Sequence, residues 1–268
     1  MNDLLLQPPY VLNEKRWYLL SVFYAREKWE KLITEIDNFF GTFRTHFFSF
    51  SEEYGDHLQI TFVTSNDNCD YSNDIQAHFQ KFVDQYPSKI ADTLPYGKIL
   101  WCNYPNNSLI WNRYSLSSYS EQYINFHKQT IRVALKLMAN DFLKETIFSA
   151  GLYLITKALM SLEINEQKNI LKKKLDEVSI KNSYDYEIVK KLLSKIDENE
   201  IYEVIKSYKN ENTNEYSLEL LYWLDEVRNV LNTYNYNIIC HFICKILGLT
   251  ELNYYAILEL LYKNYFDS

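Results

Sequence analysis

The stretch from residue 47 to residue 62 reads as strand, turn and strand, and it constrains the fold more than any other part of the chain. Side chains alternate between the two faces of a strand, so the second strand presents two different faces. The apolar face carries Leu58, Ile60 and Phe62 and predicts a hydrophobic core. The polar face carries His57, Gln59 and Thr61. We interpret that second face as either a solvated surface or the floor of a site.

Two patterns divide the chain around this hairpin. In the first part, strands are predicted at Arg16–Tyr24, Ile99–Asn103 and Ser108–Tyr114, and helices at Lys28–Phe39 and Asp74–Tyr86. In the second part, helical periodicity covers Ser120–Asn140, Phe142–Leu162, Glu166–Val178, Tyr184–Ile196, Ile201–Lys209, Leu218–Tyr234, Tyr236–Leu247 and Leu252–Tyr265. We therefore predict an α+β fold, with an N-terminal antiparallel sheet and helices followed by a mostly helical C-terminal half. We expect residues 1–268 to form one unit, with the α+β part at 1–119 and the helical part at 120–268.

Composition excludes several classes of function. A formal charge of −7 argues against nucleic acid as the partner, because phosphate binding needs a basic surface. No apolar run approaches the length of a membrane span and no signal peptide is visible, so we expect a cytoplasmic protein without membrane contact. The four cysteines of the 268-residue chain suggest no disulfide framework. There is no glycine-rich phosphate loop, and we expect no cofactor.

Few single residues point to chemistry. Cys240 and Cys244 share a helix face while His241 points about 100 degrees away, and a zinc site needs three or four converging ligands. We therefore predict no metal site there. Arg113, in Asn112-Arg-Tyr at the junction of the two parts, is either a substrate-binding group or a structural ion pair. His57, taken alone, is either a site residue or a surface or capping residue.

Several of these motifs occur in an order that resembles a known family. Trp17-Tyr precedes an aromatic segment, Phe48-Ser-Phe50, and the turn and strand Gly55-Asp-His-Leu-Gln-Ile-Thr-Phe62. Asn112-Arg-Tyr-Ser115 comes before the first long helix. His241-Phe-Ile-Cys-Lys-Ile-Leu-Gly248 comes before the last predicted helix, Leu252–Tyr265. This order and spacing resemble the thiopeptide-type bacteriocin biosynthesis domain. That domain is also the C-terminal, glutamate-eliminating part of class I lanthipeptide dehydratases.

The chain departs from that family at the arginines of its hairpin. The family pattern reads Phe-Ile-Arg-Tyr and then Gly-x-His-Leu-Arg-Leu-Arg-Phe, whereas this chain has Ser49, Gln59 and Thr61. Arginines grip a glutamyl carboxylate well because the guanidinium binds it through two parallel hydrogen bonds. Of the residues that the resemblance implies for glutamate elimination, this chain keeps only Arg113 and His241. We therefore interpret the polar face as a site for a neutral substrate.

The resemblance includes a branch of stand-alone thiopeptide pyridine synthases. These enzymes join two dehydroalanines of a modified peptide in a formal [4+2] cycloaddition, with loss of water and of the leader peptide. The resemblance implies that the catalytic residues are Arg113, His241 and Gln59. It implies that the substrate-binding residues are His57, Thr61, Ser49 and Tyr114. We expect His241 to face the same cavity as Gln59 and Arg113.

The resemblance also implies the partners. The substrate is a ribosomally made precursor peptide with a leader and a dehydrated core, and other enzymes of the pathway are further candidate partners. We expect the leader to bind along an exposed strand edge. Two alternatives stay open: a glutamate-elimination lyase of a split dehydratase, and a non-catalytic module that binds the leader.

Overall fold

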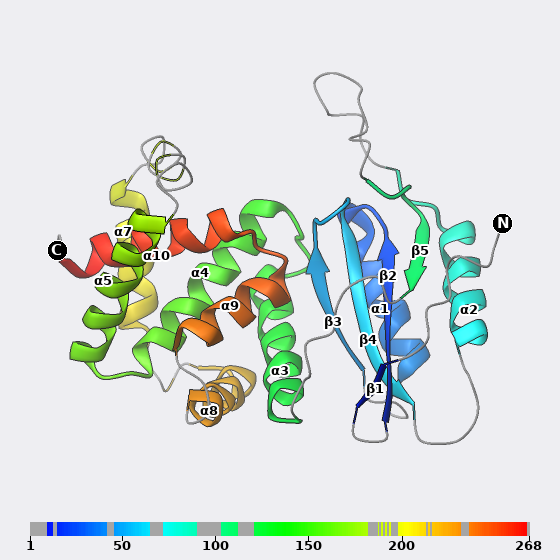
Figure 1. The fold of residues 1–268 in the computed structure, drawn as a ribbon, viewed down its shortest axis with the longest axis horizontal. Helices are drawn as coiled ribbons and strands as arrows, with labels where there is room; N and C mark the ends of the chain where they lie inside the picture. The colour runs from blue at the N-terminus through cyan, green and yellow to red at the C-terminus, as the bar shows by residue number, and fades with distance from the viewer. Residues whose placement is uncertain are drawn as a thin grey trace. The chain divides into compact units, whose positions relative to one another are not determined.

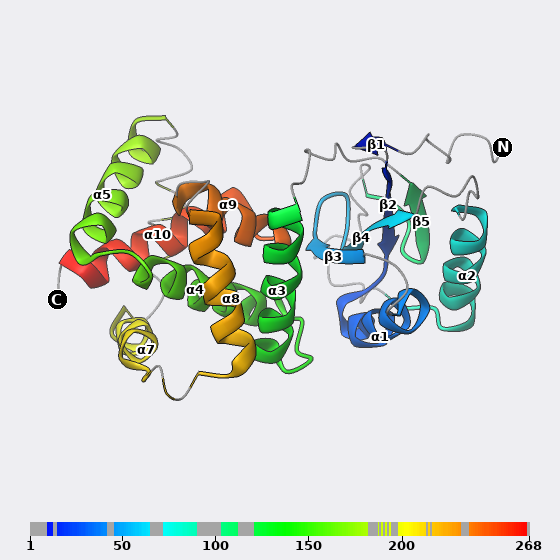
Figure 2. The ribbon, with the colours of Figure 1, turned by 90° about the horizontal axis from the view of Figure 1, so that it is seen from below.

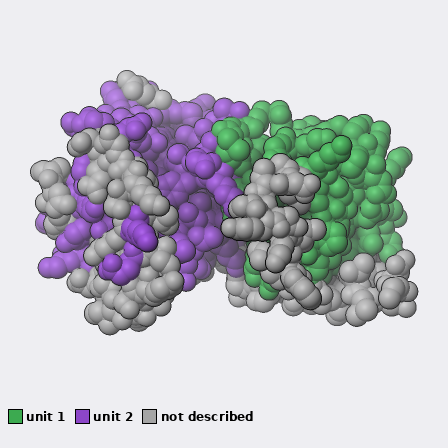
Figure 3. All heavy atoms as spheres, turned by 90° about the horizontal axis from the view of Figure 1, so that it is seen from above, with its two compact units in different colours: residues 1–120, 140–143 green, residues 121–139, 144–268 purple. Residues whose placement is uncertain are grey.

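The computed structural model is drawn as a ribbon in two views (Figures 1 and 2). It describes residues 10–12, 15–41, 46–64, 72–89, 103–111, 121–181, 187, 189, 191, 193, 198–212, 214, 216–231 and 236–266. The chain divides into two compact units, coloured separately in Figure 3. Unit 1 comprises residues 1–120 with 140–143, and unit 2 comprises residues 121–139 with 144–268. The predicted α+β fold is confirmed, whereas the grouping of residues 1–268 into one unit stays a prediction.

Unit 1 is built on a five-stranded antiparallel sheet (Figure 1). The strands are β1 (Tyr10–Leu12), β2 (Lys15–Phe23), β3 (His46–Ser51), β4 (His57–Thr64) and β5 (Ser108–Trp111). β2 pairs with β4, and β4 pairs with β3. Both β1 and β5 pair with β2, β1 near its beginning and β5 near its end. β2 and β4 are therefore the central strands of the described sheet, and β3 lies at its edge.

Two helices cover one face of this sheet (Figure 2). They are α1 (Trp29–Phe40), which follows the short 3-10 helix η1 (Arg26–Lys28), and α2 (Ser72–Gln85). The buried side chains of α1 recur every three or four residues, which gives the helix one apolar side. Trp29 stacks on Phe50 with 5.2 Å between ring centroids, and Phe40 lies 5.0 Å from Phe62. Phe79 of α2 adds to the same aromatic core beside Phe40.

The regular elements of unit 2, among its described residues, are all helices. Its helices are α3 (Glu121–Met138), α4 (Lys144–Met160), α5 (Ile164–Lys181), α7 (Glu198–Asn210), α8 (Leu218–Leu231), α9 (Tyr236–Leu247) and α10 (Glu251–Phe266). α4 is buried on every side between residues 150 and 159 and contacts the other six, so it is the centre of this bundle. Indole Nε1 of Trp223 donates to Oγ1 of Thr130 at 2.9 Å and so ties α8 to α3.

The connection between α3 and α4 belongs to unit 1. The ring of Phe142 lies 6.0 Å from Trp29 and 5.8 Å from Phe50, in the aromatic core of that unit. The amide of Asn140 donates to Oε1 of Glu30 at 2.9 Å. Of the four residues 140–143, Phe142 is therefore buried in the aromatic core of unit 1, while the other three are exposed.

Most of the predicted elements occur with shifts of a few residues at their ends. The hairpin, the strand at 15–23, both N-terminal helices and six of the eight predicted C-terminal helices match their predicted ranges closely. A seventh, Glu166–Val178, extends to Lys181. Strand β1 and helix η1 were not predicted from the sequence. Most of the predicted strand Ile99–Asn103 and of the predicted helix Tyr184–Ile196 lies outside the described residues.

Three further features of the described residues bear on function. None of their helices has the length and apolar character that crossing a membrane requires. No three of their His, Cys, Asp or Glu side chains are grouped to hold a metal ion. Cys240 and Cys244 are buried on α9 and are not joined in a disulfide, and burial raises the pKa of Cys244 to about 12.

Candidate functional site

The sheet face opposite α1 carries a row of neutral polar side chains. Gln59 on β4 pairs with Ser21 on β2 and with Ser49 on β3, so these three side chains point to the same face on adjacent strands. His57 and Thr61 lie two residues to either side of Gln59 on β4 and share that face. The structure thus brings together the four predicted residues of the hairpin. We call Ser21, Ser49, His57, Gln59 and Thr61 the polar face.

This face is not a solvated surface. His57 is 0% exposed, Thr61 is 3% exposed and Ser21 is 1% exposed, while Gln59 is only partly exposed. Of the two interpretations that the sequence left open, the solvated surface is therefore wrong. Gln59 is the most accessible member of the polar face.

The hydroxyl and amide groups of the polar face are largely unused. Within the part of the chain that the structure describes, no hydrogen bond engages the side chain of Ser21, Ser49, Gln59 or Thr61. Most buried polar groups in proteins have a partner, and leaving one unpaired costs about 1–3 kcal/mol. Neutral hydrogen-bonding capacity is therefore concentrated on this face, and the amide of Gln59 is the part that another molecule can reach.

His57 is held as a neutral imidazole at the end of the polar face. Burial lowers its pKa from 6.5 to about 4, and the hydrogen bond to Gly55 and the charge of Asp56 oppose this only in part. Its Nδ1 lies 2.9 Å from the carbonyl oxygen of Gly55. A carbonyl oxygen only accepts, so Nδ1 carries the proton and Nε2 presents a lone pair. At neutral pH this residue is therefore uncharged.

The turn before His57 is fixed by its backbone and by one buried arginine. Gly55 has φ of +114°, a conformation that residues with a Cβ rarely adopt. Arg26 donates through Nη2 to Glu52 at 2.5 Å and to Asp56 at 2.9 Å, at the two ends of the turn. Burial alone would lower the pKa of Arg26, but its bonds and charge contacts with Asp56 and Glu52 raise it overall. This clamp fixes where β4 begins and hence where His57 points.

The polar face has no charged side chain of its own. Among the described residues 17–23, 47–51 and 57–63, there is no Arg, Lys, Asp or Glu. Arg26 is committed to two carboxylates at the turn. A substrate carboxylate would therefore find no cation on these strand segments, whereas a peptide carbonyl would find neutral donors.

The remaining predicted site residues lie elsewhere. His241 is exposed on α9, so it does not point into the bundle of unit 2. It and Gln59 belong to different compact units, so a shared cavity stays a prediction. Arg113 and Tyr114 lie outside the described residues, and their roles also stay predictions.

Sequence reasoning missed Ser21. The residue stands in the apolar run Leu-Leu-Ser-Val-Phe, where a single hydroxyl interrupts a buried strand. That isolated hydroxyl was the available signal. Its place beside Gln59 became visible only with the register of β2 against β4.

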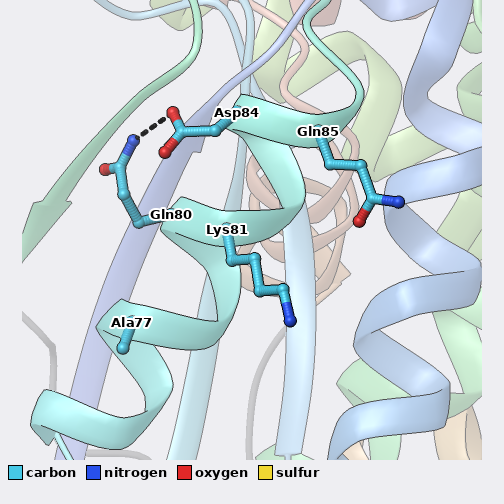
Figure 4. Close-up of a pocket in the computed structure, with 5 residues that line it drawn as sticks. All are labelled: Ala77, Gln80, Lys81, Asp84 and Gln85. Carbon is cyan, nitrogen blue, oxygen red and sulfur yellow. Dashed lines mark hydrogen bonds between the residues drawn. The ribbon is translucent and has the colours of Figure 1, made fainter.

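A shallow hollow on α2 is a poor alternative site. It is lined by Ala77, Gln80, Lys81, Asp84 and Gln85, which all come from one helix (Figure 4). Gln80 donates to Asp84 at 2.9 Å, while the side chains of Lys81 and Gln85 extend away from that pair. Among the residues that the structure describes, no second element supplies a lining group that would converge on a ligand there.

Comparison with known proteins identifies the fold. No protein-family model and no curated protein matches the sequence. Among solved structures, the chain is similar to "Pyridine synthase, TbtD, from thiomuracin biosynthesis", with a TM-score of 0.66 and 14% sequence identity. The chain has the fold of a pyridine synthase. The match covers 94% of this chain and 98% of TbtD, so the resemblance predicted from the sequence is confirmed at the level of the fold.

Proposed function

We propose that this protein is a thiopeptide pyridine synthase. The proposed reaction joins two dehydroalanines of a modified precursor peptide in a formal [4+2] cycloaddition, with loss of water and of the leader peptide. The observation that supports it best is the fold similarity to TbtD, which spans nearly the whole of both chains. The uncharged polar face supports it independently, because both reacting groups are neutral.

The polar face suits the chemistry of an amide. For the ring to close, one dehydroalanine must react through the tautomer of its amide in which the proton has moved from nitrogen to oxygen. A donor aimed at the amide oxygen stabilises the negative charge that develops there as the nitrogen proton leaves, and one well-placed donor contributes about 2–4 kcal/mol in a transition state. We assign this role to the NH2 group of Gln59, which is the most accessible donor of the face.

Two residues complete the proposed machinery. In this proposal Arg113 binds a substrate carbonyl, and His241 transfers protons during the dehydration that makes the ring aromatic. His57 and Thr61 flank Gln59 and contact the peptide, as do Ser49 and Tyr114. The substrate includes a leader, which we place on an edge strand of the sheet, and β3 is such a strand.

The deciding experiment supplies purified protein with two peptides. One is a dehydrated, thiazole-containing precursor with its leader, and the other carries glutamyl esters on Ser or Thr. We expect mass spectrometry to show loss of water and release of the leader from the first peptide only. Release of free glutamate from the second would support the lyase instead. Tight binding of the leader without turnover of either peptide would support the non-catalytic module.

A further inference from the structure

Ser21 lies at the centre of the sheet, directly opposite Gln59. The two residues are cross-strand partners on β2 and β4, and such partners have Cβ atoms about 4.5–5.5 Å apart. Ser21 is 1% exposed, and within the described residues its Oγ has no hydrogen-bond partner. A buried hydroxyl with a neighbouring, unengaged amide is the feature that needs an explanation.

Another buried serine of the same unit shows what a structural hydroxyl looks like. Ser88 is also nearly inaccessible, and its Oγ accepts from the backbone N–H of Ala25 at 2.9 Å. The same hydroxyl lies 3.0 Å from Oδ1 of Asn107. Ser21 has no such contacts, and its neighbours along β2 are Leu20 and Val22. Stability alone would favour an apolar residue at position 21.

The side chain of Gln59 can use the Ser21 hydroxyl. Its amide has a carbonyl oxygen that accepts and an NH2 group that donates, and a half-turn exchanges the two ends. A hydroxyl that donates to the oxygen fixes which end faces outward. Ser21 approaches from β2, on the side of Gln59 away from Ser49 on β3.

We propose that Ser21 is a positioning residue for Gln59. With substrate bound, Ser21 Oγ–H donates to Oε1 of Gln59 and turns the Gln59 NH2 toward a backbone carbonyl of the dehydrated peptide. The ligand recognised at this point is a neutral amide, and no cation or carboxylate takes part. This inference rests on the proposed function, because it assigns a donor to the reacting amide.

The test compares activity with stability in matched serine variants. Ser21→Ala should lower kcat about tenfold, because a Gln59 amide in the opposite orientation no longer points its NH2 group at the substrate carbonyl. Its KM and leader affinity should stay unchanged, and its Tm should be equal to or above that of the wild type. Ser21→Thr keeps the hydroxyl on a strand-favouring residue and should recover most of the lost turnover. The control Ser88→Ala should lower Tm without changing kcat.

A double-mutant cycle gives the second measurement. If Ser21 acts through Gln59, then Ser21→Ala in a Gln59→Ala background should cause no further loss of kcat. Wild-type turnover with an equally active Ser21→Ala variant would overturn this inference alone. A lower Tm for Ser21→Ala would overturn it too, since the hydroxyl would then be structural. A wild type that forms no pyridine product would overturn the proposed function and this inference together.

Discussion

Nδ1 of His57 lies 2.9 Å from the carbonyl oxygen of Gly55, and the ring of His57 packs 4.4 Å from that of Phe23. The imidazole is thus enclosed as a neutral group, and burial lowers its pKa to about 4. In an unfolded chain a histidine takes up its proton near pH 6.5. Between these two values the unfolded state binds more protons than the folded state. The free energy of unfolding therefore falls as the pH drops from about 6.5 to about 4.

The first prediction tests this pH dependence. His57→Phe keeps an aromatic ring against Phe23 and removes the titrating group. The free energy of unfolding of this variant should therefore lack the fall that His57 causes between about pH 6.5 and about pH 4. The difference in the free energy of unfolding between wild type and variant should change by about 3 kcal/mol across that range. Urea unfolding at several pH values measures it. Parallel profiles for wild type and His57→Phe would contradict the prediction.

The second prediction concerns a buried lysine in unit 2. Lys157 is 2% exposed, and its Nζ donates to the carbonyl oxygen of Tyr208 at 2.6 Å and to the hydroxyl of Tyr216 at 2.7 Å. It also pairs with Oε2 of Glu211 at 2.9 Å. Its three N–H donors therefore have three acceptors. The lysine ties α4 to the end of α7 and to the segment that follows α7.

Lys157→Met should lower the free energy of unfolding by about 2–3 kcal/mol, because these acceptors lose a charged donor. Glu211 is about one third exposed, so water offsets part of the loss. The control Lys206→Met removes an exposed pair with Glu203 and should change stability by less than about 1 kcal/mol. Urea unfolding compares the two variants. Equal effects would mean that the buried network adds nothing to stability.

The sequence predicted the hairpin and its two faces because alternation along a strand depends on local geometry alone. It could not predict that His57 and Thr61 are buried, because burial depends on packing by distant parts of the chain. Ser21 was missed for the same reason, since its pairing with Gln59 follows from the register of β2 and β4.

Two buried charged residues show the same limit of sequence reasoning. A lysine on a helix is most often solvated, yet Lys157 lies at the centre of a bundle. Arg26 follows a strand and gives no local sign of its two partners, which lie at the ends of a turn that begins 26 residues later. Both cases depend on contacts that are distant in sequence, which periodicity does not report.

The third prediction concerns Arg113, for which we propose a contact with a substrate carbonyl. Arg113→Lys keeps the charge but loses the planar, five-donor guanidinium, so turnover should fall by about tenfold or more. The fold should remain intact, with an unchanged Tm. The measurement is product formation at saturating peptide. Unchanged turnover would mean that Arg113 forms a structural ion pair and does not bind the substrate.

The last prediction restores the family's arginines to the polar face. Gln59→Arg with Thr61→Arg should weaken pyridine formation, because two uncompensated cations on a largely buried face carry a desolvation penalty of several kcal/mol per ion. Binding of the leader should survive, since we place it on a strand edge. Thr34→Arg with Gln85→Arg adds the same charge at exposed positions of α1 and α2 and should leave the reaction unchanged. Mass spectrometry of both peptide types compares the three proteins. If the wild type released glutamate, and the restored arginines increased that release, the polar face would be a weakened carboxylate site and the protein a lyase.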